Sequence, residues 1–194
     1  MRIIKKILRN LHRYVFAAFL SVIFWAWIFT FVTDTVRAKK VTLFVNVPKC
    51  ECTELEELLD KERPEGIRMI KVHPFEYAAF LTDEVETCDI YILSETDVKN
   101  NIDRFCPIPS EFYGKYSFEV FTEGESVYAI KIYDAQAQKG VLCTFIDFVP
   151  SPESGLPNED YYLCFNKTSV HLGTWNGSKD GAAVSVAELI MSIE

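Results

Sequence analysis

The sequence predicts an α/β fold: a mixed, mainly parallel sheet flanked by helices and preceded by one N-terminal transmembrane helix. An uncharged apolar run near the N-terminus predicts the membrane helix. Strand-like and helix-like segments then alternate as far as about residue 106, which predicts parallel strands joined by helical crossovers. From about residue 117 strand-like runs follow one another directly, which adds antiparallel strands. The expected parts are a cytoplasmic basic tail (1–13), a signal-anchor helix (14–33), a juxtamembrane linker (34–40) and one extracytoplasmic domain (41–194).

The predicted membrane helix is an apolar run from Tyr14 to Val32, with no charged residue between Arg13 and Asp34. A helix of about 20 residues spans the ~30 Å hydrocarbon core of a bilayer. Basic residues are more numerous before the run than after it, which favours a cytoplasmic N-terminus. A cleavable signal peptide is the alternative, but its apolar core is usually only about 7–15 residues long. We therefore expect an uncleaved, single-pass anchor in the cell membrane.

The domain expected to follow is acidic, with a net charge of −15 over residues 41–194. Its bulk charge therefore gives no attraction to nucleic acid or to an anionic membrane face. All six cysteines lie in this domain, and an even number outside the cytoplasm permits disulfides whose pairing the spacing does not assign. Three of them, Cys88, Cys143 and Cys164, lie in apolar strand-like stretches and are expected to be small buried core residues.

The first half of the domain alternates strands and helices. Residues 41–47 form an apolar run typical of a strand buried on both faces. Thr53 and Glu56 make a capping-box pattern, which predicts a helix as far as about Glu62. The other elements expected here are strands over residues 67–72 and 89–93, a short amphipathic helix opening at Pro74 and a helix capped by Ser94.

The second half is expected to consist mainly of strands. Residues 117–121 and 127–133 alternate apolar and polar side chains on either side of Glu123-Gly124-Glu125, which predicts a hairpin. Further strands are predicted over residues 141–148 and 161–165. A polar loop then precedes a predicted C-terminal helix that carries regularly spaced apolar residues.

Several of these segments together resemble one known family. They are DIYILSETDVKNNIDRFCPIP (89–109), SVYAIKIYDA (126–135) and YYLCFNKTSVHLG (161–173), which follow the strand–helix alternation. This arrangement resembles the type 2 periplasmic-binding fold of extracellular solute-binding proteins of bacterial ABC importers. The resemblance implies that the strand VYAIKIYD leads out of a first lobe and that the chain later returns to it. Only about 27 residues, Ala135 to Tyr161, separate the two strands, so the chain resembles a single, truncated lobe.

The missing lobe changes the function that the resemblance implies. Two-lobed receptors close around a ligand and exclude water, whereas a single lobe offers a half-site at most. The leading hypothesis is a non-catalytic, membrane-anchored domain that binds a protein partner or a second copy, or a small solute shared with a partner. The alternatives are a substrate-binding component of an importer and a surface enzyme that uses a Cys or an acidic residue. Neither a cofactor nor a metal is expected.

Candidate binding residues follow from a general rule for open α/β sheets, in which ligands bind outside the carboxyl ends of the parallel strands. Polar residues follow the expected strands at these ends, and the resemblance adds the end of the outgoing strand. Helix caps and solvated loops commonly carry the same residue types, which is the plainer interpretation. The candidates are Lys49, Glu51, His73, Ser94, Glu95, Tyr133 and Asp134.

Two further features stay open. Trp175 lies in a polar loop, where it either contacts a partner or packs onto the core. The pair Cys50-x-Cys52 lacks the spacing of a C-x-x-C redox motif, and only His73 is an obvious additional metal ligand. Disulfides or free loop thiols are therefore expected, with a thiol nucleophile as the alternative.

Overall fold

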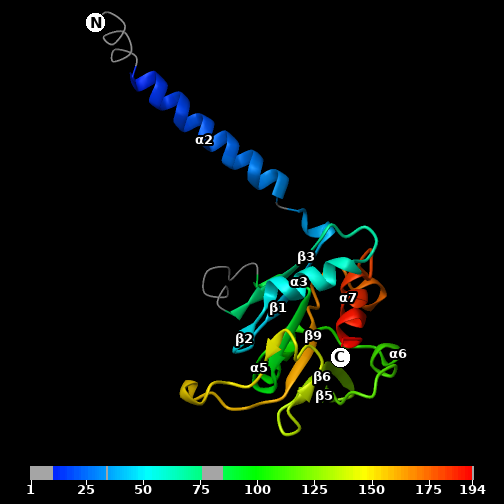
Figure 1. Cartoon of the computed structure of the whole chain (residues 1–194). Coiled ribbons are helices and arrows are strands. Elements are labelled where there is room, and N and C mark those ends of the chain that lie inside the picture. The colour runs from blue at the N-terminus through cyan, green and yellow to red at the C-terminus, as the bar shows by residue number, and fades with distance from the viewer. Residues whose placement is uncertain (1–10, 34, 76–84, 194) are drawn as a thin grey trace, which may run out of the picture. The chain divides into compact units, whose positions relative to one another are not determined.

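The computed structural model describes residues 11–33, 35–75 and 85–193 of the chain. The chain divides into two compact units, Met1–Val36 and Arg37–Glu194. The described part of the first unit is dominated by one helix, α2 (Leu11–Thr33), shown in blue in Figure 1. The predicted basic tail lies almost wholly outside the described residues.

Within the described part of the chain, no helix is both long and apolar enough to cross a membrane. This finding corrects the prediction of a transmembrane signal-anchor helix. Helix α2 has 23 residues.

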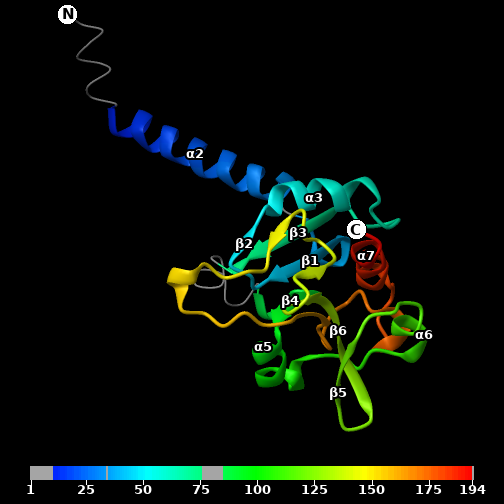
Figure 2. The ribbon, with the colours of Figure 1, turned by 60° about the horizontal axis from the view of Figure 1, so that its bottom comes forward.

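The second unit is built on a mixed sheet. Its strands and those of a small separate ribbon are β1 (Lys40–Val45), β2 (Lys49–Cys50), β3 (Met69–Pro74), β4 (Ile90–Ser94), β5 (Val120–Glu123), β6 (Ser126–Asp134), β7 (Lys139–Gly140), β8 (Ile146–Asp147) and β9 (Tyr161–Phe165). The described strands of the sheet follow the order β3-β1-β4-β9-β6-β5, with β7 paired to β6. Strands β2 and β8 form the ribbon, and the β5–β6 hairpin lies at one end of the sheet (Figure 2).

The sheet is mixed but not mainly parallel, which corrects that part of the predicted fold class. Among the described strands, β1 pairs in parallel with β3 and β4, whereas every ladder that involves β9 or β6 is antiparallel. The reason is the place of β9, which returns between β4 and β6 and runs opposite to both. Strand β6 therefore has the direction of β4 without being its neighbour.

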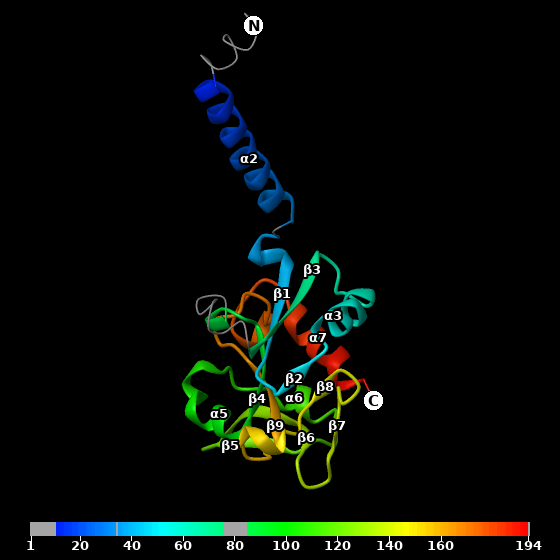
Figure 3. The ribbon, with the colours of Figure 1, turned by 60° about the vertical axis from the view of Figure 1, so that its left-hand side comes forward.

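Helices cover both faces of the sheet. The helical segments of this unit are η1 (Arg37–Lys39), α3 (Cys52–Lys61), α5 (Glu95–Asn100), η3 (Ile102–Arg104), α6 (Ser110–Tyr113), η4 (Pro152–Ser154), η5 (Gly173–Trp175) and α7 (Ala182–Met191). Figure 3 shows α3 and α7 on one side of the sheet and α5 on the other. The sheet is thus buried on both faces, as the continuous apolar runs of its central strands predict.

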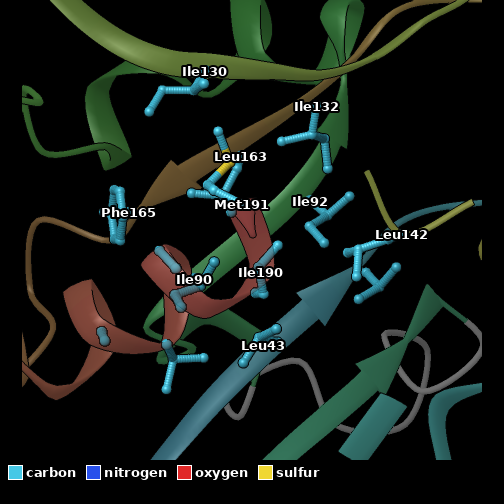
Figure 4. Packing of buried hydrophobic residues seen from close by; sticks show 14 of the residues in the cluster. Leu43, Ile90, Ile92, Ile130, Ile132, Leu142, Leu163, Phe165, Ile190 and Met191 are labelled. Atoms are coloured by element: carbon cyan, nitrogen blue, oxygen red, sulfur yellow. The ribbon is translucent and has the colours of Figure 1, made fainter. Parts of the chain in front are cut away.

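Strand alternation divides the core into two clusters. Leu43, Ile90 and Ile92 face α3 and α7, and the larger cluster around them includes Leu163 and Ile190 (Figure 4). The side chains that alternate with these along the strands point to the other face. They include Phe44, Tyr91 and Leu93, which belong to a smaller cluster with Val98 of α5 and with Phe105. Because side chains alternate between the faces of a strand, neighbouring residues serve different cores.

Several local predictions are confirmed. Ser94 caps α5, because its Oγ accepts a hydrogen bond from the backbone N–H of Asp97 at 3.2 Å. The hairpin forms as β5 and β6, and Gly124 takes the left-handed conformation (φ +61°) that its turn requires. The C-terminal helix forms as α7.

Other local predictions are wrong or lie outside the described residues. Helix α3 starts at Cys52 without a side-chain cap, and Glu56 of the expected capping box instead accepts the backbone N–H of Val72 at 2.8 Å. The strand predicted over 141–148 shrinks to β8, because Leu142 adopts a left-handed backbone (φ +66°) and the segment turns. Most of the helix expected after Pro74 lies outside the described residues.

Candidate functional site

The parallel strands end at one edge of the sheet, which we call the carboxyl edge. Strands β1, β3 and β4 run in the same direction, and β6 shares it because β4 and β6 are both antiparallel to β9. Ser94 at the end of β4 and Tyr133 near the end of β6 both pair with Tyr161. The sheet therefore brings the ends of these strands together, as the binding rule for open α/β sheets requires.

A pocket of about 230 Å³ opens at this edge, on the face that carries α5. Four of its lining residues are aromatic or aliphatic side chains of the smaller core cluster: Phe44, Tyr91, Leu93 and Phe105. Phe75, just after β3, and Val85 complete the apolar part of the wall. The pocket thus begins where β1, β3 and β4 end and continues along the α5 face, because Phe105 pairs with Asn166 beside the start of β4.

Three of the aromatic rings form a continuous row. The ring centroids of Phe44 and Tyr91 are 6.2 Å apart, and those of Tyr91 and Phe105 are 5.7 Å apart. The Tyr91 hydroxyl donates to the carbonyl of Val85 at 2.8 Å, which fixes the ring in the wall. Burial is the main cause that raises the pKa of Tyr91 above its usual value, so the phenol stays neutral. Phe75, by contrast, is 56% exposed.

Four polar side chains line the rest of the pocket: Asn46, Asp97, Asn101 and Arg104. The Asn46 amide donates to Oδ2 of Asp97 at 2.6 Å, which connects the end of β1 to α5. The Asn101 amide donates to the backbone carbonyl of Asp97 at 2.9 Å. The Arg104 guanidinium pairs with the exposed carboxylate of Glu86 at 3.2 Å. Apolar walls with a few convergent polar groups are typical of small-molecule sites.

The sequence places Asp97 through the helix cap. Ser94 is the N-cap of α5, so Asp97 is the third helical residue and its side chain lies in the first turn, where a carboxylate is favourable. Tyr91 and Leu93, on the preceding strand, face the same side as α5.

Apart from Trp175, the predicted site residues lie near the carboxyl edge, and none of the predicted residues lines the pocket. Lys49 and Glu51 form an exposed ion pair at 3.2 Å beside the small ribbon. His73 is buried in β3. Ser94 caps α5, and Glu95 pairs with Lys99 across one turn of that helix.

Asp134 and Tyr133 lie at the end of β6, where their side chains make contacts within the fold. The Asp134 carboxylate accepts the backbone N–H groups of Ala137 and Gln136, and these bonds lower its pKa. Tyr133 stacks on Phe148 with the ring centroids 4.5 Å apart, on the face opposite the pocket. Its buried hydroxyl has no hydrogen-bond partner among the described residues.

Trp175 lies at the other edge of the sheet. Its ring packs edge-on against Phe112 and Phe165, with centroids 5.1 Å and 5.0 Å away. Phe165 is the last residue of β9, which runs toward the amino ends of the parallel strands. Trp175 is thus half-buried against the larger core cluster, on the face of the sheet opposite the pocket.

None of the six cysteines, all of which lie in the described residues, forms a disulfide. Cys88 and Cys164 are buried as expected, whereas Cys143 is exposed because its segment turns instead of forming a strand. Cys50 and Cys52 interact, and a hydrogen bond from the Cys50 thiol lowers the pKa of Cys52 while it raises that of Cys50. Among the described residues, no three His, Cys, Asp or Glu side chains are arranged to hold a metal ion.

The chain was compared with known protein families, with curated proteins and with solved structures. None of the three comparisons gave a match. The candidate site therefore rests on geometry alone. The sequence pointed to the carboxyl edge but not to the residues that line the pocket, because what these residues share is one face of the sheet. Phe44, Tyr91 and Leu93 alternate with core residues, and which face holds a pocket depends on long-range packing.

Proposed function

We propose that the second unit is a non-catalytic binding domain whose pocket at the carboxyl edge takes a small solute. The observation that carries this proposal is the position of the pocket: a 230 Å³ cavity with aromatic walls and convergent polar groups that opens beside the ends of β1, β3 and β4 and continues along the α5 face. Open α/β sheets bind their ligands at this place because loops and helix N-termini converge there.

The resemblance to one lobe of a solute-binding protein is part of the proposal. Strands β6 and β9, the outgoing and returning strands of that resemblance, are antiparallel neighbours within one sheet, which supports it. The connection between them contains only short elements such as β7, β8 and η4. A single lobe leaves its ligand partly exposed, so we expect weak binding, with a dissociation constant of about 1 μM to 1 mM, unless a partner protein covers the pocket.

The experiment is thermal unfolding of the full-length protein with a panel of small cations, anions and neutral molecules. A ligand present at 100 times its dissociation constant stabilises the native state by about 2.7 kcal/mol. For a chain of this size that corresponds to an increase in Tm of about 5–10 °C. At least one class of ligand should produce such an increase.

A matched pair of variants ties the increase to the pocket. Asn101→Phe places a ring in the pocket from its half-exposed rim, whereas Asn100→Phe adds the same ring at an exposed neighbouring position. Asn101→Phe should abolish the ligand-dependent increase in Tm, and Asn100→Phe should retain it. An increase that survives in Asn101→Phe, or no increase with any class of ligand, would contradict the proposal.

A further inference from the structure

We propose that the ligand of this pocket is a small organic cation, an amine or quaternary ammonium compound with a short apolar body. This inference rests on the proposed function, because it assigns a ligand class to the same pocket. It is carried by the charge of Asp97, by the aromatic row and by the size of the cavity.

Asp97 supplies a carboxylate that the protein leaves incompletely paired. Its Oδ2 accepts one hydrogen bond, from the neutral amide of Asn46. Its Oδ1 accepts none from the part of the chain that the structure describes, and no Lys or Arg in that part forms an ion pair with it. A half-buried carboxylate gains most from a charged donor, because burial weakens its hydration. A ligand ammonium group supplies such a donor.

The aromatic row suits the same charge. Phe44, Tyr91 and Phe105 present adjacent rings within one wall. A cation within about 6 Å of a ring centroid is attracted to the electron-rich face of the ring. Phe75 adds a further ring, and a phenylalanine that is 56% exposed beside a pocket is covered when a ligand binds. Carboxylate and rings together therefore recognise a cation with apolar substituents.

The surrounding charge disfavours an anion. Arg104, the cationic side chain of the wall, is already paired with Glu86 at 3.2 Å. Residues 41–194 carry a net charge of −15, which raises the local concentration of cations and lowers that of anions. The pocket therefore presents a net negative potential to a ligand in solution.

The cavity limits the size of the ligand. A volume of 230 Å³ corresponds to the share of about seven or eight water molecules in the liquid. Choline and phenethylamine are of this size, and each has a neutral counterpart of nearly the same shape. These counterparts are 3,3-dimethyl-1-butanol and 2-phenylethanol.

The test measures the binding of these two pairs, together with anionic phenylacetate, to the full-length protein by calorimetry and thermal unfolding. At least one cation should bind ten or more times as tightly as its neutral counterpart, because the loss of a charge-assisted contact typically costs a factor of this order. Equal binding of the cation and its counterpart, or preferential binding of phenylacetate, would overturn the inference and leave the proposed pocket intact. Absence of binding by every probe would overturn the inference, and the proposed function would fall with it only if the wider panel of ligands also produced no increase in Tm.

Two substitutions in the first turn of α5 test the role of Asp97, one as the test and one as its control. Asp97→Asn and Glu95→Gln each remove one carboxylate from the first turn of α5, but only Asp97 lines the pocket. Asp97→Asn should weaken cation binding at least tenfold and abolish the preference over the neutral counterpart. Glu95→Gln should leave the affinity for the cation and the preference over the neutral counterpart within twofold of the unsubstituted protein. This result separates a contact at Asp97 from the general loss of negative charge. Equal effects of the two substitutions would refute a role for Asp97.

Phe75→Leu tests the aromatic contribution without disturbing the core, since Phe75 is largely exposed. The substitution should weaken binding of the cation more than binding of the neutral counterpart, because Leu retains an apolar contact but has no ring face. Equal weakening of both members of a pair would show that Phe75 contributes apolar area only.

Discussion

Replacing Asp89 with Asn should destabilise the domain strongly, because this buried carboxylate holds three segments together. Asp89 is fully buried just before β4. Its Oδ2 accepts the backbone N–H and the hydroxyl of Thr42 in β1, at 2.9 Å and 3.0 Å. Its Oδ1 accepts the Ser169 hydroxyl at 2.6 Å. Ser169 in turn accepts the backbone N–H of His171 at 3.0 Å.

The magnitude follows from the donors that an amide fails to satisfy. Asn has one acceptor oxygen, and if it faces Thr42 then the amide NH₂ faces Ser169, whose hydroxyl proton loses its acceptor. One charge-assisted bond of about 1.5–3 kcal/mol is lost. The two bonds from Thr42 become neutral and about half as strong, a further loss of roughly 1 kcal/mol. The lower burial cost of a neutral side chain offsets part of this loss, so we expect about 3 kcal/mol.

The assay is urea unfolding of the full-length protein, with Asp103→Asn as the control. Asp103 is exposed, so its substitution should change the free energy of unfolding by less than about 0.5 kcal/mol. Combining Asp89→Asn with Ser169→Ala completes a double-mutant cycle, which should give a coupling energy above about 1 kcal/mol. A cost for Asp89→Asn below about 1 kcal/mol, or strictly additive effects, would refute this account of the network.

Two further predictions concern single side chains. Burial alone would lower the pKa of His171, but its ring nitrogens lie 2.7 Å from the Asp180 carboxylate and 3.0 Å from the Arg37 carbonyl, and together these acceptors raise it. The stability that protonated His171 contributes is therefore complete below the unfolded-state pKa of about 6.5 and is lost as the pH rises through the higher folded-state value. Urea unfolding from pH 5.5 to 9 should show this loss. A pH profile of stability that Asp180→Asn leaves unchanged would contradict the prediction. Tyr133→Phe removes a buried hydroxyl that has no partner among the described residues, so urea unfolding should show no loss of stability or a gain of up to about 1 kcal/mol, and a loss above 1 kcal/mol would reveal a partner for that hydroxyl.

The secondary structure was predictable from the sequence wherever the signal is local. Ser94 caps α5 because a serine hydroxyl satisfies the free N–H groups of a first helical turn, and that signal needs no distant partner. The pattern Thr53-x-x-Glu56 has the same local form, yet Glu56 bonds to Val72 and Lys71 on β3 instead. Contacts between α3 and the sheet therefore override the local cap, and such contacts are not encoded in the pattern.

The sheet order was less predictable, because strand neighbours are set by packing across the whole chain. The alternation of strands and helices correctly indicated parallel pairing of β1 with β3 and β4. Nothing local shows that β9 inserts between β4 and β6, which makes the remaining pairs antiparallel. The same limit applies to the candidate site. The edge of the sheet can be predicted from strand direction, whereas the face that holds the pocket depends on which elements cover each side.

The two edges of the sheet differ in how completely their polar groups are paired. At the amino edge, where β1, β3 and β4 begin, Asp89, Ser169 and His171 form hydrogen bonds with one another or with nearby backbone. Asn166 donates to the carbonyls of Glu86 and Cys88 at the same edge. Pairing of this kind makes an edge rigid and leaves it little to offer a ligand.

The carboxyl edge has the opposite character. Asp97 keeps an oxygen without a donor among the described residues, and it lies beside open volume and an exposed Phe75. Asp89 precedes β4 and Asp97 lies in α5 after it, and the two carboxylates share no hydrogen-bond partner among the described residues. Perturbations of distant sites without shared partners usually add independently. The network at the amino edge therefore supports the fold, and the ligand that we propose for the pocket would gain its binding energy from groups that the fold has left unpaired.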